Sequence, residues 1–183
     1  LVMVTHDPGN WFEETLRSVA DQTYPDLAVL VVDTASTDDP TDRVRAVLPD
    51  AVVHRLDHDP GFGGAANQVR DLVEGAKFLV LCHDDVALDA GTVRTLVEEA
   101  FRSNAGVIGP KLVRWDDPRR LLQVGVGADK TGVLVPLNER NELDQEQFDA
   151  VRDVFLVPGA CTLIRADLFD ALEKIQLGTA RKV

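Results

Sequence analysis

The chain has 183 residues, a mass of 20.0 kDa and a formal net charge of -12. Hydrophobic residues make up 45% and charged residues 27%, which excludes a disordered chain and allows one domain with a real core. No basic cluster interrupts the acidity, so we expect no nucleic acid partner. No apolar run is long enough to cross a bilayer, so we expect any membrane association to come only through segments absent here.

The first part of the chain alternates apolar runs of strand length with amphipathic stretches of helical period. Strands are expected at residues 1–5, 27–32, 51–55, 78–82 and 105–108. Helices are expected to begin at Asn10, after the cap Asp39, after the glycine-rich loop 59–64 and over residues 89–103. This alternation predicts a doubly wound α/β fold with a mostly parallel central sheet.

The pattern changes after residue 110. Residues 121–128, 133–137 and 154–164 have strand character without strong helices between them, and 138–149 resembles a mobile loop or a short surface helix. We expect a mixed-sheet extension that closes one side of the first half within a single domain. Residues 1–110 would then be the ligand-binding half, and residues 111–183 a partial second half.

Two acids follow the most apolar strand. Asp84 and Asp85 come directly after residues 78–82, and open α/β sheets bind ligands at the carboxyl ends of their strands. Paired carboxylates repel each other unless a positive charge lies beside them. A divalent cation that carries phosphate oxygens fits this requirement. The alternative is that one of the acids caps the helix near Asp89.

Polar residues also follow two other expected strands. Because the carboxyl ends of parallel strands share one edge, these groups are expected to converge with the acid pair. The glycine-rich loop is weaker evidence, since it matches neither the dinucleotide fingerprint nor a P-loop. Cys82 and Cys161 lie in apolar runs and are expected to pack as small hydrophobic residues. The converging groups are Thr5, His6 and Asp7 after the first strand, and Asp33, Ser36 and Asp38 after the second.

The sequence resembles the family 2 glycosyltransferases in five loose segments that occur in the family's order. The first strand and a Q-x-Y-P-like turn come first, then V-V-D-x-x-S-x-D and a glycine-rich region with Asp59 where Asn is commoner. An acidic metal motif and a G-A-x-x-x-x-R strand and helix complete the match, which reaches Phe169 and looks most like bacterial enzymes that build envelope glycans. The segments are residues 2–5 and 22–25, 31–38 (VVDTASTD), 59–68 (DPGFGGAANQ), 79–97 (LVLCHDDVALDAGTVRTLV) and 157–169 (VPGACTLIRADLF).

The resemblance implies a GT-A fold, a nucleoside-diphosphate sugar as donor, with UDP-sugar favoured, and Mn²⁺ or Mg²⁺ as cofactor. It places Asp85 and Asp84 at the cation, which would stabilise the leaving diphosphate as a Lewis acid. The base pocket would come from the ends of the first two strands, and the glycine-rich region with Asn67 would border the ribose or phosphates. The implied nucleotide-binding residues are Thr5, His6, Asp33, Ser36, Gly63, Gly64, Asn67 and Asp84.

Several of these residues also allow a simpler interpretation. His6 could be an ordinary loop histidine, Asp38 a turn acid before Pro40, and Asn67 a solvent-facing helix residue. His83 could bind a metal, although one histidine beside two acids is not a three-ligand zinc pattern. The family's general base comes after the last matching helix, and no such motif follows Phe169. We therefore name no catalytic base, and Glu173 is a poor candidate; a segment could be missing between residues 175 and 176.

The favoured hypothesis is a metal-dependent, inverting glycosyltransferase that acts on a glycan or lipid-linked acceptor. A non-catalytic domain of the same fold is the main alternative, because the expected base is absent. A nucleotidyltransferase would need a basic glycine-rich loop after the first strand, which residues 6–10 do not supply. We expect a cytoplasmic location, at the cytoplasmic face of the membrane if the chain is part of a larger protein, because nucleotide sugars are cytoplasmic.

Overall fold

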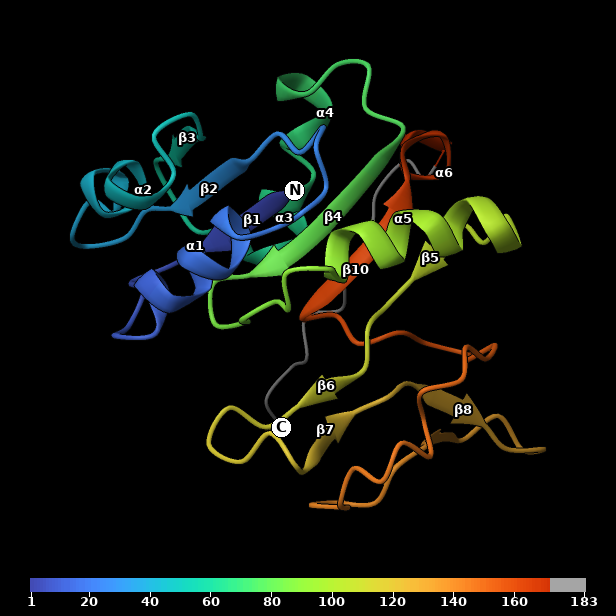
Figure 1. Ribbon diagram of the computed structural model, residues 1–183. Helices are drawn as coiled ribbons and strands as arrows, with labels where there is room; N and C mark the ends of the chain where they lie inside the picture. Colours follow the sequence, from blue (N-terminus) through green and yellow to red (C-terminus); the bar gives the residue numbers. More distant parts are fainter. Residues whose placement is uncertain (172–183) are drawn as a thin grey trace.

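The computed structural model describes residues 1–171, which form ten strands and six helices (Figure 1). The strands are β1 (Val2–Thr5), β2 (Leu30–Thr34), β3 (Val52–Leu56), β4 (Phe78–His83), β5 (Val107–Ile108), β6 (Leu112–Val113), β7 (Leu121–Gln123), β8 (Val126–Ala128), β9 (Leu134–Pro136) and β10 (Cys161–Arg165). The helices are α1 (Phe12–Ala20), α2 (Thr41–Val47), α3 (Gly61–Ala66), α4 (Val69–Leu72), α5 (Thr92–Ser103) and α6 (Ala166–Ala171).

The central sheet has six strands in the order β3-β2-β1-β4-β10-β5. Strands β3, β2, β1 and β4 pair in parallel, while β10 runs antiparallel between β4 and β5. The mostly parallel α/β fold predicted from the sequence is therefore confirmed. The late strand β10 does not extend the sheet at its edge, because it separates β5 from β4.

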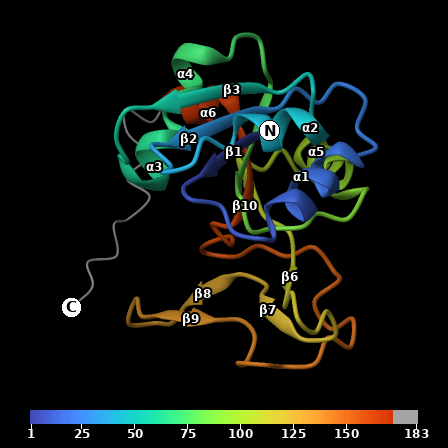
Figure 2. The ribbon, with the colours of Figure 1, turned by 90° about the vertical axis from the view of Figure 1, so that its left-hand side faces the viewer.

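Helices cover both faces of this sheet, as Figure 2 shows edge-on. On one face, α1, α2 and α5 bury an apolar stripe against alternate residues of the strands, among them Met3, Val31 and Val80. On the other face, α3, α4 and α6 pack against the intervening residues, among them Val4 and Val32. Apolar residues on both faces explain why β1, β2 and β4 are continuous hydrophobic runs in the sequence.

Three of the predicted helix and strand boundaries differ from those in the structure. The first helix begins at Phe12, two residues after Asn10, and no side-chain capping bond forms there. β2 begins at Leu30 and runs on through Asp33, because that residue pairs with strands on both sides. The glycine-rich segment is not a loop. It forms α3, whose small residues Ala65 and Ala66 pack fully buried on the sheet.

Residues between β5 and β10 form a second region beside the sheet, built from the separate hairpins β6–β7 and β8–β9 (Figures 1 and 2). Of the expected strand at 154–164, only Cys161–Arg165 is a strand, and Leu156 makes an isolated bridge to Val126. Residues 138–149 contain no helix. They are tied to the region by Lys111, whose ammonium lies 2.6 Å from Asp144 and 2.5 Å from Asp149.

Replacement of a side chain at the centre of β10 tests its place in the core. Leu163 is fully buried, with 0% of its surface exposed, and β10 pairs with both β4 and β5. We expect Leu163→Ala to lower the free energy of unfolding by about 2–5 kcal/mol in urea denaturation, through lost burial and a cavity. The matched Leu122→Ala, on an exposed side chain of β7, should change it by less than about 0.5 kcal/mol. Equal effects of the two substitutions would contradict the insertion of β10.

Candidate active site

Thr5, Asp33 and Asp84, three of the residues expected to converge, lie together at the carboxyl edge of the parallel strands. Thr5, Asp33 and Arg55 are partners in register on β1, β2 and β3, and register partners share one face of a sheet. The next register position on β4 after the pair Val4 and His83 is that of Asp84, and the Thr5 hydroxyl donates to the Asp84 carboxylate at 2.6 Å. A polar row of Arg55, Asp33, Thr5 and Asp84 thus crosses four strands.

Asp33 is the most buried acid of the row, with no exposed surface. Its Oδ1 accepts hydrogen bonds from the backbone N–H of Ser36, at 3.2 Å, and from the Ser36 hydroxyl. Its Oδ2 makes no hydrogen bond to any of residues 1–171, but the Arg55 guanidinium lies 3.3 Å away. Burial of an unpaired carboxylate costs free energy, and the ion pair with Arg55 offsets this cost for Asp33.

The loops after β1 and β2 are locked together beside Asp33. The Asp7 backbone N–H donates to the Ser36 hydroxyl, and the Thr37 backbone N–H donates to the Asp7 carboxylate at 2.6 Å. Asp7 and Ala35 have positive φ angles of 46° and 59°, a conformation that costs free energy for residues other than glycine. Ser36 is buried, and its hydrogen bonds to Asp33 and Asp7 position the Asp33 carboxylate.

Arg43 holds the rest of the first loop. Its guanidinium makes a forked pair with Glu13 and donates to the carbonyls of Pro8 and Gly9, at 3.0 and 2.9 Å. These bonds lower the pKa of Glu13 to about 2. The pair connects α1, α2 and the loop that begins with His6, and the sequence reasoning missed it.

His6 lies half-exposed at the same edge. Its Nδ1 lies 2.7 Å from the Thr34 carbonyl, so this nitrogen carries the proton and donates. The carbonyl raises the pKa of the imidazole, and Asp7, 3.7 Å from Nε2, adds to the effect. The ring is therefore fixed by the backbone of β2.

Asp84 and Asp85 form the other end of the row. Asp84 is half-buried and Asp85 is exposed. Burial raises the pKa of Asp84 and the neighbouring Asp85 adds to it, while the hydrogen bond from Thr5 opposes them. None of the ion pairs formed within residues 1–171 involves either acid. The two negative charges thus lack a cationic partner in the described part of the chain.

The carboxylates of Asp84 and Asp85 suit a cation that takes its remaining ligands from water and substrate. No cluster of three or more His, Cys, Asp or Glu side chains suited to a metal occurs in residues 1–171. Two adjacent carboxylates do match Mg²⁺ or Mn²⁺, which take one or two protein carboxylates with water and substrate phosphate oxygens. Asp85 and Asp84 are the residues that would hold it.

The segment after the acid pair is fastened to α1 by the Q-x-Y-P-like turn. The Gln22 amide donates to the Asp89 carbonyl and accepts from the Val93 N–H, and the Thr23 N–H donates to the Ala90 carbonyl. The alternative cap role for Asp84 or Asp85 receives no support from α5, which begins at Thr92 after Gly91 without a side-chain capping bond. The acids precede the helix by seven residues or more.

The glycine-rich segment reaches the edge through an aromatic contact. The centroid of the Phe62 ring on α3 lies 4.2 Å from that of the His83 ring, the last residue of β4. Gly63 and Gly64, which follow Phe62, are therefore close to the end of β4. Asn67 follows α3, and its buried amide oxygen has no hydrogen-bond partner among residues 1–171. The roles assigned to these residues stay predictions.

The remaining candidates lie outside this row. Asp38 is exposed in the loop before α2. Asp39, the expected cap, accepts a hydrogen bond from the Thr41 N–H, but the N-cap residue of α2 is Pro40. Cys82 and Cys161 are buried, unbridged register partners, so the expected packing is confirmed. Glu173 and residues 175–176 lie beyond the described residues.

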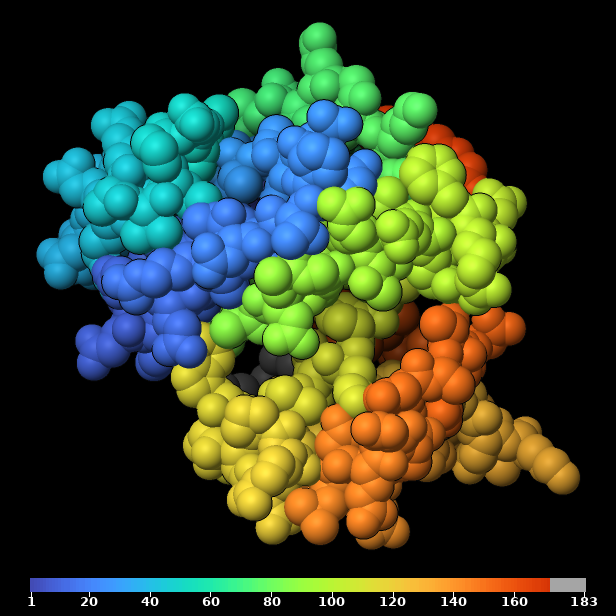
Figure 3. Space-filling view, viewed as in Figure 1, coloured from blue at the N-terminus to red at the C-terminus, as the bar shows by residue number. Residues whose placement is uncertain are grey.

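The surface of the molecule is hollowed between its two regions. The space-filling view shows a depression between the green segment that follows β4 and the yellow and orange region that contains β6 to β9 (Figure 3). A separate surface hollow of about 430 Å³, lined by Lys77, Phe78 and Arg165 among others, lies at the opposite end of β4.

Comparisons with known proteins agree with this geometry. The family model described as glycosyl transferase family 2 matches residues 1–172. Solved structures with a similar fold include a mannosyltransferase and the protein TarS. The chain belongs to glycosyl transferase family 2. A comparison with curated proteins gives no match.

Two solved structures illustrate the likeness. The mannosyltransferase PcManGT from Pyrobaculum calidifontis, in complex with GDP-Man and Mn²⁺, is 19% identical with a TM-score of 0.63, over 94% of this chain and 46% of that one. S. aureus TarS 1-349 in complex with UDP is 23% identical with a TM-score of 0.55, over 61% of this chain and 34% of that one. At these identities the likeness concerns the fold. The chain spans less than half the length of either protein.

Removal of one charge from the acid pair should stabilise the fold. The pKa of Asp84 is raised on folding, so its ionised form costs stability at neutral pH, and this cost disappears as pH falls through the raised pKa. Asp84→Asn keeps an acceptor for Thr5 and should raise the free energy of unfolding at pH 7 by roughly 0.5 kcal/mol, the size of one like-charge repulsion.

Urea denaturation at several pH values measures this effect. The gain should shrink as the wild-type Asp84 becomes protonated in acid, and Asp89→Asn, at an exposed position, should show no such trend. A destabilised Asp84→Asn protein would contradict the account and make Asp84 a structural acid.

Proposed function

We propose that the chain is the catalytic domain of a metal-dependent, inverting glycosyltransferase that uses a nucleoside-diphosphate sugar, with UDP-sugar as the favoured donor. The observation that carries the proposal is the polar row at the carboxyl edge of the sheet. Toward one end lies the buried acid Asp33, which is paired with Arg55, and at the other end lies an acid pair without a cationic partner within residues 1–171.

The dimensions of the row suit a nucleotide. Adjacent strands lie about 4.8 Å apart, so Asp33 and Asp84 are separated by two strand spacings, or about 10 Å. A base held near Asp33 and His6 would extend its ribose across Thr5 and place its diphosphate near Asp84 and Asp85. Gly63, Gly64 and Asn67 are proposed to border the ribose or phosphates from the opposite face of the sheet.

The proposed reaction needs little covalent chemistry from the protein. The acceptor hydroxyl attacks the anomeric carbon of the donor as the bond to the diphosphate oxygen breaks, which inverts that carbon. When bound, Mn²⁺ or Mg²⁺ supplies Lewis-acid stabilisation of the leaving diphosphate. Asp84 and Asp85 would hold the cation, and the hydrogen bond from Thr5 orients Asp84. The hydroxyl proton goes to a general base that is not assigned within residues 1–171.

The acceptor is proposed to be a glycan or a lipid-linked sugar, bound on the side of residues 111–183, while residues 1–110 bind the donor. Within residues 1–171 no helix is long and apolar enough to cross a membrane. We propose a cytoplasmic site of action, because nucleotide sugars are made there. The net charge of -12 would be repelled by an anionic leaflet, so attachment to the membrane would require other segments.

The metal role is tested by one substitution in the exposed half of the acid pair. Asp85→Ala should lower the Mn²⁺-dependent gain in UDP affinity at least about tenfold, the size of loss typical for groups that tune a metal site. Its melting temperature should not fall, since the substitution relieves repulsion. Calorimetric titration with UDP, with and without Mn²⁺, measures the affinity.

Asp89→Ala is the matched control, because this exposed acid lies four residues further along the same segment. It should leave the metal dependence unchanged. Equal UDP affinity with and without Mn²⁺ in the wild-type protein would count against the metal role. Release of UDP from a UDP-sugar in the presence of Mn²⁺ separates the enzyme from a non-catalytic binding domain, which would bind the donor without turnover.

A further inference from the structure

Arg55 belongs to the polar row, but the proposed function gives it no role in binding the nucleotide. It lies on β3 in register with Asp33. Its Nη1 is 3.3 Å from Asp33 Oδ2 and 3.5 Å from Asp39 Oδ1, and its Nη2 donates to the Ser36 carbonyl at 2.5 Å. The guanidinium therefore touches three groups of the segment that follows β2.

The two oxygens of Asp33 are not equivalent. Oδ1 already accepts two hydrogen bonds from Ser36, whereas Oδ2 accepts none within residues 1–171 and faces Arg55. A carboxylate oxygen has two lone-pair sites, so Oδ1 is satisfied and Oδ2 is the acceptor still available. Asp33 thus offers a ligand one acceptor and not two.

Arg55 controls access to that acceptor. Asp33 is fully buried, whereas 39% of the Arg55 side chain is exposed. A long side chain that is partly exposed can shift at small cost, whereas the Asp33 carboxylate is fixed by Ser36. A ligand N–H that reaches Oδ2 takes the place of the guanidinium, which stays beside it through Ser36 and Asp39 and has donors free for a neighbouring carbonyl.

We propose that Arg55 is a specificity-determining residue that, together with the single free oxygen of Asp33, selects uracil over guanine in the donor nucleotide. Uracil presents one N–H between two carbonyl oxygens, which fits one acceptor with a donor at its side. Guanine presents two adjacent N–H groups beside its carbonyl. One of them would lie against a satisfied oxygen, and an unpaired donor in a closed site is costly. This inference rests on the proposed function, since it assumes that a nucleoside diphosphate binds at this edge.

Calorimetric titration of the whole chain with UDP and with GDP, at saturating Mn²⁺, tests the inference without any substitution. UDP should bind at least about tenfold more tightly than GDP. Arg55→Gln should weaken UDP binding about ten- to hundredfold, the loss expected for a hydrogen bond that involves a charged group. It should change GDP binding less than threefold, so that the preference disappears.

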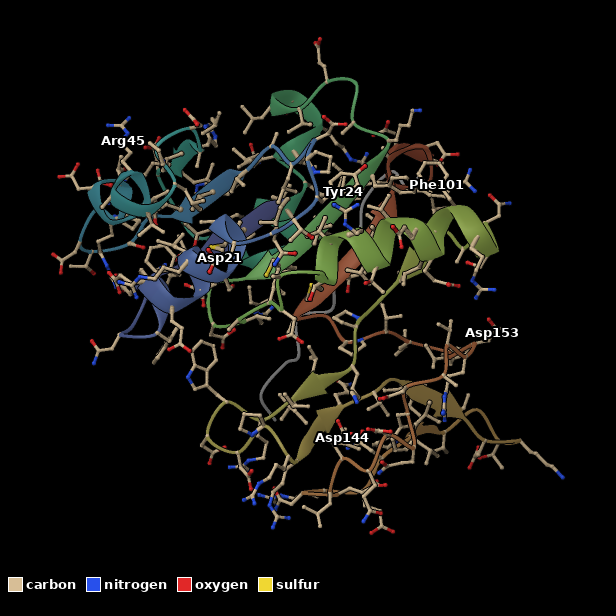
Figure 4. The ribbon with its side chains drawn as sticks, in the orientation of Figure 1. Asp21, Tyr24, Arg45, Phe101, Asp144 and Asp153 are labelled. Carbon is tan, nitrogen blue, oxygen red and sulfur yellow. The ribbon has the colours of Figure 1, made fainter. Side chains whose placement is uncertain are left out.

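Arg45→Gln is the matched control. It makes the same change of charge at an exposed arginine of α2, which points outward from the molecule (Figure 4). It should retain the wild-type affinities for both nucleotides. Arg55→Gln leaves the buried Asp33 without its cation, so its fold is checked by thermal melting. Arg55→Lys keeps the charge without the planar fork and should lose the preference while it remains folded.

The outcomes separate this inference from the function on which it rests. Equal affinity of the wild-type protein for UDP and GDP would overturn the role of Arg55 and leave the proposed function standing. An unchanged preference in folded Arg55→Gln or Arg55→Lys would do the same. Failure of both nucleotides to bind would overturn the proposed function and this inference with it.

Discussion

The parallel register of β3, β2, β1 and β4 determines where every charged group of the candidate site lies. Because these strands run in the same direction, their last residues meet at one edge, and the pairing of Thr5 with Asp33 and of Asp33 with Arg55 places them in a line. The hydrogen bond from Thr5 to Asp84 extends this line to β4. A shift of one residue in any of these strands would turn its polar side chain to the opposite face.

The two ends of this line differ in how far their charges are balanced. At the Asp33 end, charge is buried and balanced by Arg55, and the loops beside it are held by Ser36 and Asp7 even though two residues adopt positive φ angles. At the Asp84 end, two adjacent like charges have no cationic partner in residues 1–171. The Asp33 end is therefore preorganised, whereas the Asp84 end would be stabilised by a bound positive charge. This arrangement suits a ligand whose base lies at Asp33 and whose phosphates lie at Asp84.

The sequence was sufficient for the fold class and for the convergence of Thr5, Asp33 and Asp84, because apolar runs followed by polar residues are local patterns. It could not supply Arg55, since only the register of β3 reveals that this residue faces Asp33. The place of β10 depends on a pairing between residues about eighty positions apart, such as Cys82 with Cys161. The helical state of residues 61–66 was missed because glycine disfavours helices in isolation, whereas close packing of Ala65 and Ala66 on the sheet stabilises this one.

The central claim is that a metal–nucleotide complex binds at the carboxyl edge of the sheet, and nuclear magnetic resonance of the labelled protein with Mn²⁺ and UDP tests it most directly. The paramagnetic ion broadens amide signals near it. The account predicts that, with UDP present, broadening by Mn²⁺ centres on Asp84, Asp85 and Thr5. With the diamagnetic ion Mg²⁺ in place of Mn²⁺, Asp33 and Arg55 should change their chemical shifts when UDP binds. Broadening centred instead on the acids around Lys111, Asp144 and Asp149, with the edge of the sheet unchanged, would contradict it.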